Sequence, residues 1–566
     1  MEREFSYGPM LNAYPDSIGE TLSDAVALLR SPALENAFSS FYILPSLFNT
    51  DLDRGFSVID YRLNGLLARK EDLEALQALG IELKLDFILN HASVLSPQFR
   101  DILEKGAASP YADFFINWNT FWQGAGTMTE QGYIQPDPEK IKNMFFRKAG
   151  LPILMVRMPD GQDVPYWNTF YQEVRYPVLD PQDLLEMTDG LYGVAAKLAE
   201  AANRATAAGR LPEAEDLGSL ASWLEPLTRL LKSRRTYLGQ MDLNIRSPLV
   251  WDFYRDTLQK LHGYGARIVR LDAFAYAPKE VGSRNFMNDP GTWDLLARIR
   301  ELADPLSLSL LPEIHASYEE GVYRTIGEKG YMVYDFFLPG LILDALEEQS
   351  GETLAAWARE IVSRGFRTLN MLGCHDGIPL LDLKGLLPEE RIQKLIDTVV
   401  SRGGMIKNLH GAKNVYYQVN VTYYSALGED DRKMLLVALQ MFMPGKPQVW
   451  YLDLFAGRND LEAVHRAGPG GHKEINRTNL SRADCEARLA EPLVRAQLAL
   501  LKMRNASAAF APDAAISVSC SGPALSFTWR AGGEEASLTA DLSSCSFTAR
   551  ITDAATGAEK ARIASD

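Results

Sequence analysis

The sequence predicts an α/β fold: a (β/α)8 TIM barrel that carries two inserted domains and a C-terminal antiparallel β-domain. Short apolar runs alternate with amphipathic stretches along most of the 566 residues, and repeated strand-then-helix order is typical of a parallel sheet with crossover helices. This many repeats favours a closed barrel over an open sheet. A composition of 46% hydrophobic and 23% charged residues is also sufficient to bury a large core.

The expected barrel strands are short apolar runs. They lie at 41–45, 81–90, 266–274, 308–315, 330–336, 367–376 and 446–452. Helices are expected after Asn64 and over 292–303, where apolar residues recur at helical spacing. After about Arg504 polar and apolar residues alternate, which predicts a small antiparallel sheet.

Two long stretches interrupt this rhythm. Residues 92–246 are too long for one loop and predict an inserted domain after the third strand; within them, 183–235 is rich in Ala and Leu at helical spacing and predicts two helices. Residues 377–428 form a second insertion. The expected division is a barrel in three parts (1–91, 247–376 and 429–504), the two inserted domains, and a β-domain over 505–566.

The charge balance excludes several classes of partner. Lys and Arg total 58 against 73 Asp and Glu, a net charge of −15 that repels nucleic acid backbones and anionic membrane surfaces. The four cysteines form no C-x-x-C pair, the N-terminus shows no signal-peptide pattern, and no apolar run approaches the roughly 20 residues of a membrane helix. We therefore expect a cytoplasmic protein.

Polar residues follow four of the expected strands, at the barrel end where active sites form. The carboxylates Asp272, Glu313 and Asp376 come from three different strands, and they are accompanied by other polar side chains: His91, Arg270, His315 and His375. A nucleophilic carboxylate, a proton-donating acid and a third anion that stabilises an oxocarbenium ion are what retaining glycoside chemistry requires.

Each of these residues has a structural alternative when taken alone. An Asp at a strand end often caps the next helix, Glu313 could be a buried salt-bridge partner, and His91 could be a core histidine. A catalytic metal is disfavoured because no H-x-H or H-E-x-x-H motif occurs, and a nucleotide site because no P-loop occurs and the glycines of 467–474 lack a strand–helix context. We expect no metal and no cofactor.

Eight ordered strings resemble glycoside hydrolase family 13, and more narrowly its sucrose phosphorylase subfamily, which includes sucrose, sucrose 6′-phosphate, glucosylglycerol and glucosylglycerate phosphorylases. Among them are LDFILNH (85–91), RIVRLDAFAY (267–276), LLPEIHASY (310–318), GCHDGIP (373–379) and EINRTN (474–479). The resemblance extends from AYPDSIGE (13–20) to about residue 504. It implies the same barrel, with B and B′ domains as the two insertions.

The resemblance also implies a role for each matching residue. Asp272 would be the nucleophile, Glu313 the acid/base with a raised pKa, and Asp376 the transition-state stabiliser, while Arg270 would keep Asp272 ionised. The residues implied in substrate binding are Asp53, Phe56, His91, Gln240, Arg270, Tyr276, His315, His375, Tyr417, Gln418 and Arg477. A phosphate-binding cation is implied at Arg147 or Lys148, with Arg234 or Arg235 as the next candidates.

The implied activity is transfer of a glucosyl unit from sucrose or a related small α-glucoside to inorganic phosphate, giving α-D-glucose 1-phosphate, by a monomer or homodimer. A retaining α-glucosidase or transglucosidase on the same site is the alternative, and a catalytically dead carbohydrate-binding protein would need a lost carboxylate. Three departures leave the acceptor open: Val415 replaces an acid usual in sucrose-specific members, the loop 410–418 is short, and the helical insert 183–235 could reshape the entrance.

Overall fold

The computed structural model describes residues 6–147, 150–408, 416–428, 430–468 and 470–565. Its centre is an eight-stranded sheet in the order β14-β13-β5-β2-β1-β19-β16-β15, in which every pairing is parallel. In chain order the strands are β1 (Met10–Ala13), β2 (Ser40–Ile43), β5 (Glu82–Ile88), β13 (Ala266–Asp272), β14 (Ser309–Pro312), β15 (Val333–Asp335), β16 (Thr368–Met371) and β19 (Lys446–Trp450). The Met332 amide donates to the Leu310 carbonyl (3.4 Å) and joins the two ends of the sheet. The predicted (β/α)8 barrel is confirmed.

All seven predicted strands overlap an observed one, and β1 is the barrel strand that the prediction lacked. Its four residues, MLNA, are fully buried and include Asn12, a polar residue inside the barrel. A run this short, with an amide in it, has too little apolar character to be recognised as a strand.

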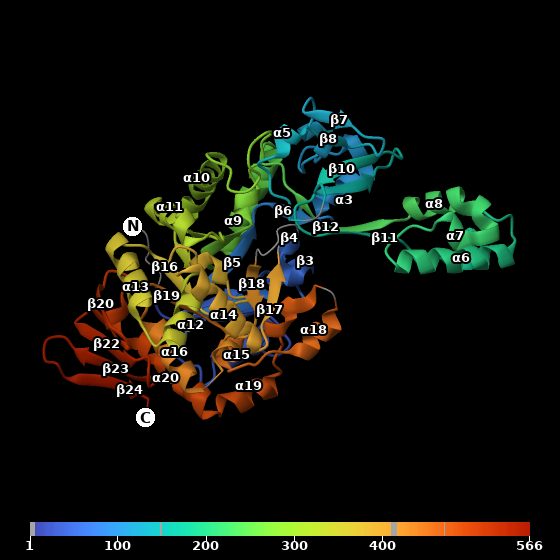
Figure 1. Cartoon of the computed structure of the whole chain (residues 1–566). Coiled ribbons are helices and arrows are strands. Elements are labelled where there is room, and N and C mark those ends of the chain that lie inside the picture. The colour runs from blue at the N-terminus through green and yellow to red at the C-terminus, as the bar shows by residue number, and fades with distance from the viewer. Residues whose placement is uncertain (1–5, 148–149, 409–415, 429, 469, 566) are drawn as a thin grey trace.

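Helices surround the sheet (Figure 1). They are α1 (Leu22–Leu29), α2 (Lys70–Ala78), α9 (Pro248–Gly263), α10 (Gly291–Ala303), α11 (Val322–Glu328), α12 (Leu338–Glu348), α13 (Glu352–Arg364), α16 (Asp430–Phe442), α17 (Tyr451–Leu454), α18 (Leu461–Ala467), α19 (Arg482–Leu489) and α20 (Pro492–Ala506). Helix α9 illustrates their amphipathic pattern, because Val250, Tyr254, Leu258 and Leu261 repeat at helical spacing and are buried. None of the helices in the described ranges combines the length and the apolar character needed to cross a bilayer.

The segment 92–246 leaves the barrel after β5 and returns along an antiparallel strand. It contains α3 (Pro97–Lys105), α4 (Trp118–Phe121), β7 (Gly126–Met128), β8 (Ile134–Pro136), α5 (Pro138–Ile141), β9 (Ile153–Arg157), β10 (Asp163–Trp167), β11 (Gln172–Arg175) and β12 (Thr236–Asp242). Strand β12 pairs with β6 (His91–Ser93), with Asp242 opposite His91. This pairing places the far end of the insertion beside the end of β5.

Residues 176–235, which we call the arm, project away from the barrel between β11 and β12 (Figure 1). As predicted, the arm contains two long helices, α6 (Tyr192–Ala207) and α8 (Leu224–Ser233), with the short helix α7 (Ala214–Leu217) between them. It has a hydrophobic core of its own that includes Leu198, Leu227 and Leu231.

The remaining elements follow β16 and α20. The second insertion contains α14 (Glu389–Ser401), the hairpin β17 (Met405–Asn408) and β18 (Tyr416–Asn420), and α15 (Tyr423–Leu427); a further hairpin, β3 (Phe48–Leu52) and β4 (Ser57–Leu63), follows β2. The C-terminal part is the predicted antiparallel sheet: β20 (Ala515–Ser521), β21 (Ala524–Ala531), β22 (Glu534–Asp541), β23 (Ser546–Asp553) and β24 (Glu559–Ala564). Trp529 of this sheet is buried and donates to the carbonyl of Phe442 in α16 (2.8 Å).

Candidate active site

The three predicted carboxylates lie at the carboxyl ends of barrel strands. Asp272 is the last residue of β13, Glu313 follows β14 directly, and Asp376 lies in the loop after β16. Strand β13 is paired in register with β5 and β14, so that Asp272 lies opposite Ile88 and Leu271 lies opposite Pro312. The strand ends therefore meet at one level of the barrel, as predicted.

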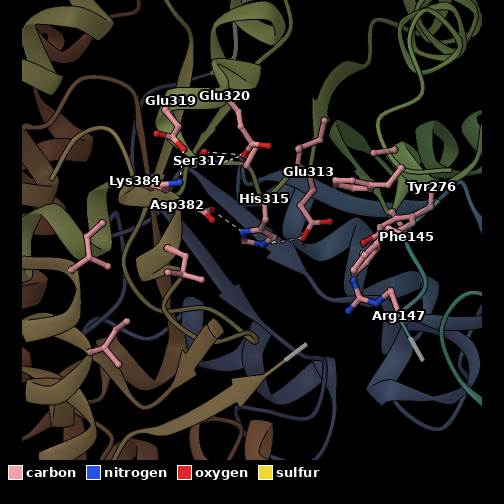
Figure 2. Close-up of a pocket in the computed structure, with 18 of the residues that line it drawn as sticks. Phe145, Arg147, Tyr276, Glu313, His315, Ser317, Glu319, Glu320, Asp382 and Lys384 are labelled. Atoms are coloured by element: carbon pink, nitrogen blue, oxygen red, sulfur yellow. Dashed lines mark hydrogen bonds and ion pairs between the residues drawn. The ribbon is translucent and has the colours of Figure 1, made fainter. Parts of the chain in front are cut away.

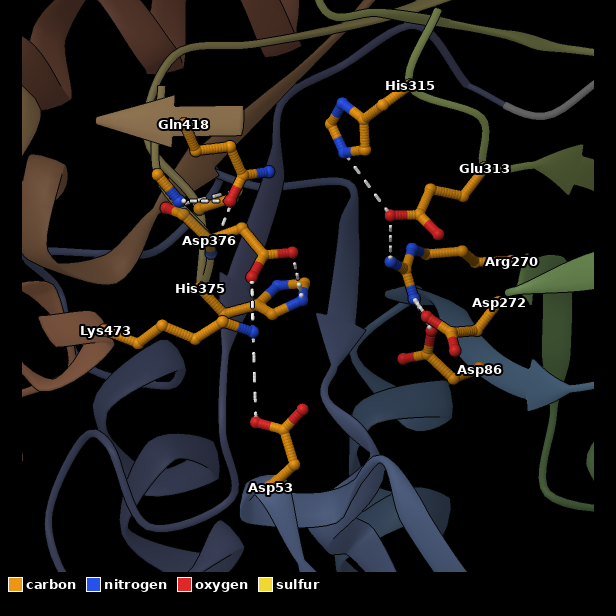
Figure 3. Close-up of polar contacts among 12 residues, drawn as sticks. Asp53, Asp86, Arg270, Asp272, Glu313, His315, His375, Asp376, Gln418 and Lys473 are labelled. Carbon is orange, nitrogen blue, oxygen red and sulfur yellow. Dashed lines mark hydrogen bonds and ion pairs between the residues drawn. The ribbon is translucent and has the colours of Figure 1, made fainter. Parts of the chain in front are cut away.

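Arg270 is the centre of one charged cluster, which we call the Arg270 cluster (Figure 3). Its guanidinium is 3% exposed and contacts three carboxylates: Asp86 at 2.6 Å, Asp272 at 2.9 Å and Glu313 at 3.0 Å. Asp86, fully buried on β5, also accepts from the Tyr42 hydroxyl (2.8 Å). A single buried cation thus contacts both carboxylates to which the sequence resemblance gives the nucleophile and acid/base roles.

His315 extends this cluster toward the second insertion. Its Nε2 lies 3.5 Å from the Glu313 carboxylate and its Nδ1 lies 3.1 Å from Asp382. Burial by itself lowers the pKa of His315, but the two carboxylates outweigh burial and raise that pKa to about 10. His315 is therefore a cation at neutral pH.

The raised pKa expected for Glu313 differs from the direction that this geometry gives. Burial raises the pKa of Asp272, and Arg270, which it shares with two other carboxylates, does not offset that burial. Burial also acts to raise the pKa of Glu313, but Arg270 and His315 together outweigh it and lower that pKa. The raised pKa was implied by the resemblance, and spacing along the chain does not reveal the contact with His315 that helps to lower it.

A second charged cluster, which we call the Lys473 cluster, faces the first (Figure 3). Lys473 Nζ lies 2.8 Å from Asp376 Oδ1 and 3.9 Å from Asp53 Oδ1, and Arg477 lies 4.0 Å and 3.7 Å from the same two side chains. Arg477 Nε donates to the His375 carbonyl (2.8 Å) and thereby fixes the backbone beside Asp376. The structure brings the predicted Asp53, Asp376 and Arg477 together.

Phe56 lies between the clusters, where its backbone carbonyl is held by two predicted residues. His91 Nε2 is 3.0 Å and Gln240 Nε2 is 3.1 Å from the Phe56 oxygen. The Phe56 ring stacks on His375 (4.8 Å between centroids), and the Arg270 guanidinium lies 5.5 Å above it. Gly55 makes this turn possible, because its φ is +123° and a Cβ would lie 2.3 Å from the Ser46 nitrogen.

A cavity of about 870 Å³ opens beside Glu313 (Figure 2). Arg147 and Tyr276 form one wall; the Arg147 guanidinium donates to the Tyr276 hydroxyl (3.0 Å) and lies 4.9 Å from the Phe170 ring centroid. The opposite wall includes Asp382 and the ion pair of Lys384 with Glu319 (2.9 Å). Arg147 therefore faces the same space as the acid Glu313.

Some predicted residues are placed elsewhere or not described. Lys148 and Val415 lie outside the described residues, as does the side chain of Tyr417. Gln418 accepts from the Gly377 amide (3.3 Å) beside Asp376. Arg234 pairs with Asp183 and Arg235 with Asp163, and neither lines the cavity.

Among the residues of the site, those that were not predicted from the sequence include Asp86, Phe170, Asp382 and Lys473. Lys473 lies in the glycine-rich stretch that was set aside because it is not a phosphate loop, and Asp382 lies six positions after Asp376. Nothing in a single sequence separates Phe170 from the chain's 23 other phenylalanines. The signal that could have found Lys473 is its position four residues before Arg477, on the same loop.

Comparison with known proteins agrees with this geometry. The chain is 50% identical to a sucrose 6(F)-phosphate phosphorylase of Ilumatobacter coccineus over 95% of this chain and 94% of the relative. It is 31% identical to a sucrose phosphorylase of Streptococcus mutans over 90% and 89% of the two chains. The crystal structure of the sucrose 6F-phosphate phosphorylase from Thermoanaerobacter thermosaccharolyticum superposes with a TM-score of 0.79 at 28% identity, covering 99% and 98%. No protein-family profile matches the chain.

Proposed function

For this chain, which belongs to the sucrose phosphorylase subfamily of glycoside hydrolase family 13, we propose that the preferred donor is sucrose 6F-phosphate. The enzyme transfers a glucosyl unit to inorganic phosphate and forms α-D-glucose 1-phosphate. Hydrolysis by an α-glucosidase on the same site is not favoured, because the relatives that match along the whole chain are phosphorylases.

Asp272 is the proposed nucleophile, since it ends β13 and is oriented by Arg270 at 2.9 Å. Its attack on the anomeric carbon gives a covalent glucosyl-enzyme, and Glu313 donates a proton to the leaving oxygen. Donor cleavage requires a proton on Glu313. Because Arg270 and His315 both contact Oε1 of this residue, Oε2 is the oxygen from which we propose that the proton reaches the leaving group. Two displacements at one carbon give a retained configuration.

The proposed glucosyl pocket lies between the two charged clusters. The unpartnered atoms His375 Nδ1 and Gln418 Nε2, both buried in the described part of the chain, support this assignment because buried polar atoms are usually hydrogen-bonded. Asp53, His91 and Arg477 complete the proposed contacts to sugar hydroxyls. Gln240 contributes indirectly, since its amide binds the backbone of Phe56 and Tyr171.

One observation carries the phosphate step: Arg147 is held at the cavity wall, opposite Glu313, by Tyr276 and Phe170. A chain with a net charge of −15 repels phosphate as a whole. A fixed guanidinium beside the acid/base is thus the local positive charge that an attacking phosphate requires.

The 50% identity to a sucrose 6(F)-phosphate phosphorylase favours the phosphorylated donor. The sequence adds a second argument, because Val415 stands where sucrose-specific members place an acid, and an acid there would repel a sugar phosphate. A phosphorylated donor does not cross membranes unaided, so we propose a cytoplasmic enzyme. A monomer or a homodimer is consistent with this scheme.

The test is a comparison of sucrose and sucrose 6F-phosphate as donors, with and without inorganic phosphate. We expect glucose 1-phosphate from both, with kcat/KM at least about tenfold higher for the phosphorylated donor, the effect of one charge-assisted contact. Asp272→Asn is the control and removes both activities. Equal or better turnover of sucrose would refute the donor assignment, and free glucose as the main product would refute phosphorolysis.

A further inference from the structure

Lys279 is a buried cation behind one wall of the cavity. Its side chain is 1% exposed, and its ammonium lies 2.7 Å from Asp242 Oδ2, 3.0 Å from Asn90 Oδ1 and 2.5 Å from the Tyr276 carbonyl. A buried charge is costly unless it is paired and hydrogen-bonded. Three oxygen partners from three separate segments make Lys279 the point at which these segments are joined.

Each partner of Lys279 belongs to or holds a segment that carries one of three neighbouring rings, those of His91, Phe170 and Tyr276. Asp242, at the end of β12, accepts from the Thr169 amide (2.8 Å) and hydroxyl (2.6 Å), and so fixes the residue before Phe170. Asn90 precedes His91 and also donates to Asp242 (3.1 Å). The third partner is the backbone of Tyr276 itself.

The side chains next to these anchors form a continuous aromatic wall. The His91 and Phe170 rings lie 4.9 Å apart, and the Phe170 and Tyr276 rings lie 5.2 Å apart in an edge-to-face arrangement. Arg147 rests on this wall, 4.9 Å from the Phe170 centroid and hydrogen-bonded to the Tyr276 hydroxyl. The position of the Arg147 guanidinium therefore depends on Phe170 and Tyr276, both of which are fixed from behind through Lys279.

We propose that Lys279 is a positioning residue for the phosphate step: its ammonium fixes the aromatic wall that holds Arg147 opposite Glu313. This inference rests on the proposed role of Arg147. The donor side depends less on Lys279, because His91 has a separate contact to the Phe56 carbonyl (3.0 Å) and Asp272 is held by Arg270. Loss of Lys279 should therefore affect phosphate more than the sugar donor.

The experiment compares Lys279→Met with Lys279→Met/Asp242→Asn, which removes the ion pair as a whole and avoids leaving a buried carboxylate unpaired. For the double variant we expect the KM for phosphate to rise about tenfold and more of the glucosyl-enzyme to react with water, since a charge-assisted contact is misaligned. Formation of the glucosyl-enzyme from α-glucosyl fluoride should stay within about threefold of wild type. An unchanged KM for phosphate overturns the inference.

The matched control is Lys446→Met. Lys446 is equally buried, but at the opposite end of the barrel, where it donates to the Gly8 carbonyl (2.9 Å) and the Ser39 hydroxyl (3.1 Å). It should lower the melting temperature and leave the KM for phosphate unchanged. A rise in that KM for Lys446→Met as well would mean that general destabilisation causes the effect, and would overturn the positioning role.

A double-mutant cycle with Arg147→Ala separates this inference from the proposed function. If Lys279 acts through Arg147, adding the Lys279 substitutions to Arg147→Ala should cause little further loss in phosphate efficiency. Additive losses would overturn the inference and leave the role of Arg147 intact. No effect of Arg147→Ala by itself would refute the proposed phosphate site, and the inference with it.

Discussion

Replacing Lys473 by Met should weaken donor turnover strongly, because it removes the closest cation to Asp376. At 2.8 Å and an effective dielectric constant of about 20, the gross attraction is about 6 kcal/mol. Most of this is offset by the desolvation of both groups, and a hydrogen bond to a charged partner nets about 1.5–3 kcal/mol. Arg477 is too far away, at 4.0 Å, to replace that hydrogen bond. We expect kcat/KM for the donor to fall about ten- to a hundredfold.

The assay is steady-state formation of glucose 1-phosphate at varied donor and at varied phosphate. The loss should appear in kcat/KM for the donor, while the KM for phosphate should change little. Lys473 contacts Asp53 and Asp376 and does not line the wall that carries Arg147. Lys394→Met, which removes an exposed ion pair with Glu348, is the control and should behave as wild type. A Lys473→Met enzyme within about threefold of wild type on the donor would refute the reasoning.

Three further predictions follow from the same contacts. Glu313→Gln should slow cleavage of the natural donor far more than cleavage of α-glucosyl fluoride, whose leaving group needs little protonation. Equal losses of rate for the two donors would indicate that Glu313 has a structural role. Because the pKa of His315 is raised to about 10, protonated His315 stabilises the folded protein. This contribution is complete below about pH 6.5, the pKa of an unfolded histidine, and is lost as the pH rises through 10. Between pH 7 and 10 the free energy of unfolding in urea should fall by roughly 2–4 kcal/mol more for wild type than for His315→Gln. The same pH dependence of the unfolding free energy in both proteins would contradict this. Arg175 and Thr236 face each other across β11 and β12, so the arm can be replaced by an Asn-Gly turn between them. Turnover should stay within about threefold of wild type, because no arm residue lines the cavity. A folded but inactive variant would show that the arm contributes to the site.

The barrel and its carboxylates could be predicted from the sequence because strand order and strand ends are local properties. Seven barrel strands are apolar runs, and the three carboxylates lie at or just after the ends of three of them: Asp272 ends β13, Glu313 follows β14 and Asp376 lies in the loop after β16. The geometry of a parallel barrel then brings residues far apart in sequence to one rim. Strand β1 was missed because its first two residues, Met10 and Leu11, form an apolar run that is bounded by Pro9 and Asn12.

The electrostatics of the site could not be predicted, because they depend on contacts between segments that are distant in sequence. Glu313 and Asp382 are 69 positions apart, yet both contact His315 and together keep it cationic. That cation, with Arg270, lowers the pKa of Glu313, for which a raised pKa was expected. The position of the arm is a similar case: its helices follow from local spacing, but its direction away from the barrel depends on the pairing of β11 with β12.

Both charged clusters contain more carboxylates than cations, which suits the chemistry that we propose. In the Lys473 cluster two cations, Lys473 and Arg477, face three carboxylates, Asp53, Asp376 and Glu474. In the Arg270 cluster two cations, Arg270 and His315, face four carboxylates, Asp86, Asp272, Glu313 and Asp382, so an excess of negative charge remains even when one of the four carries a proton. An oxocarbenium-like transition state develops positive charge between the clusters, and pre-arranged anions stabilise it without reorganisation. Neutralising Asp86 as Asn, which keeps its shape but reduces this excess, should therefore slow glucosyl transfer even though Asp86 is fully buried beneath Arg270.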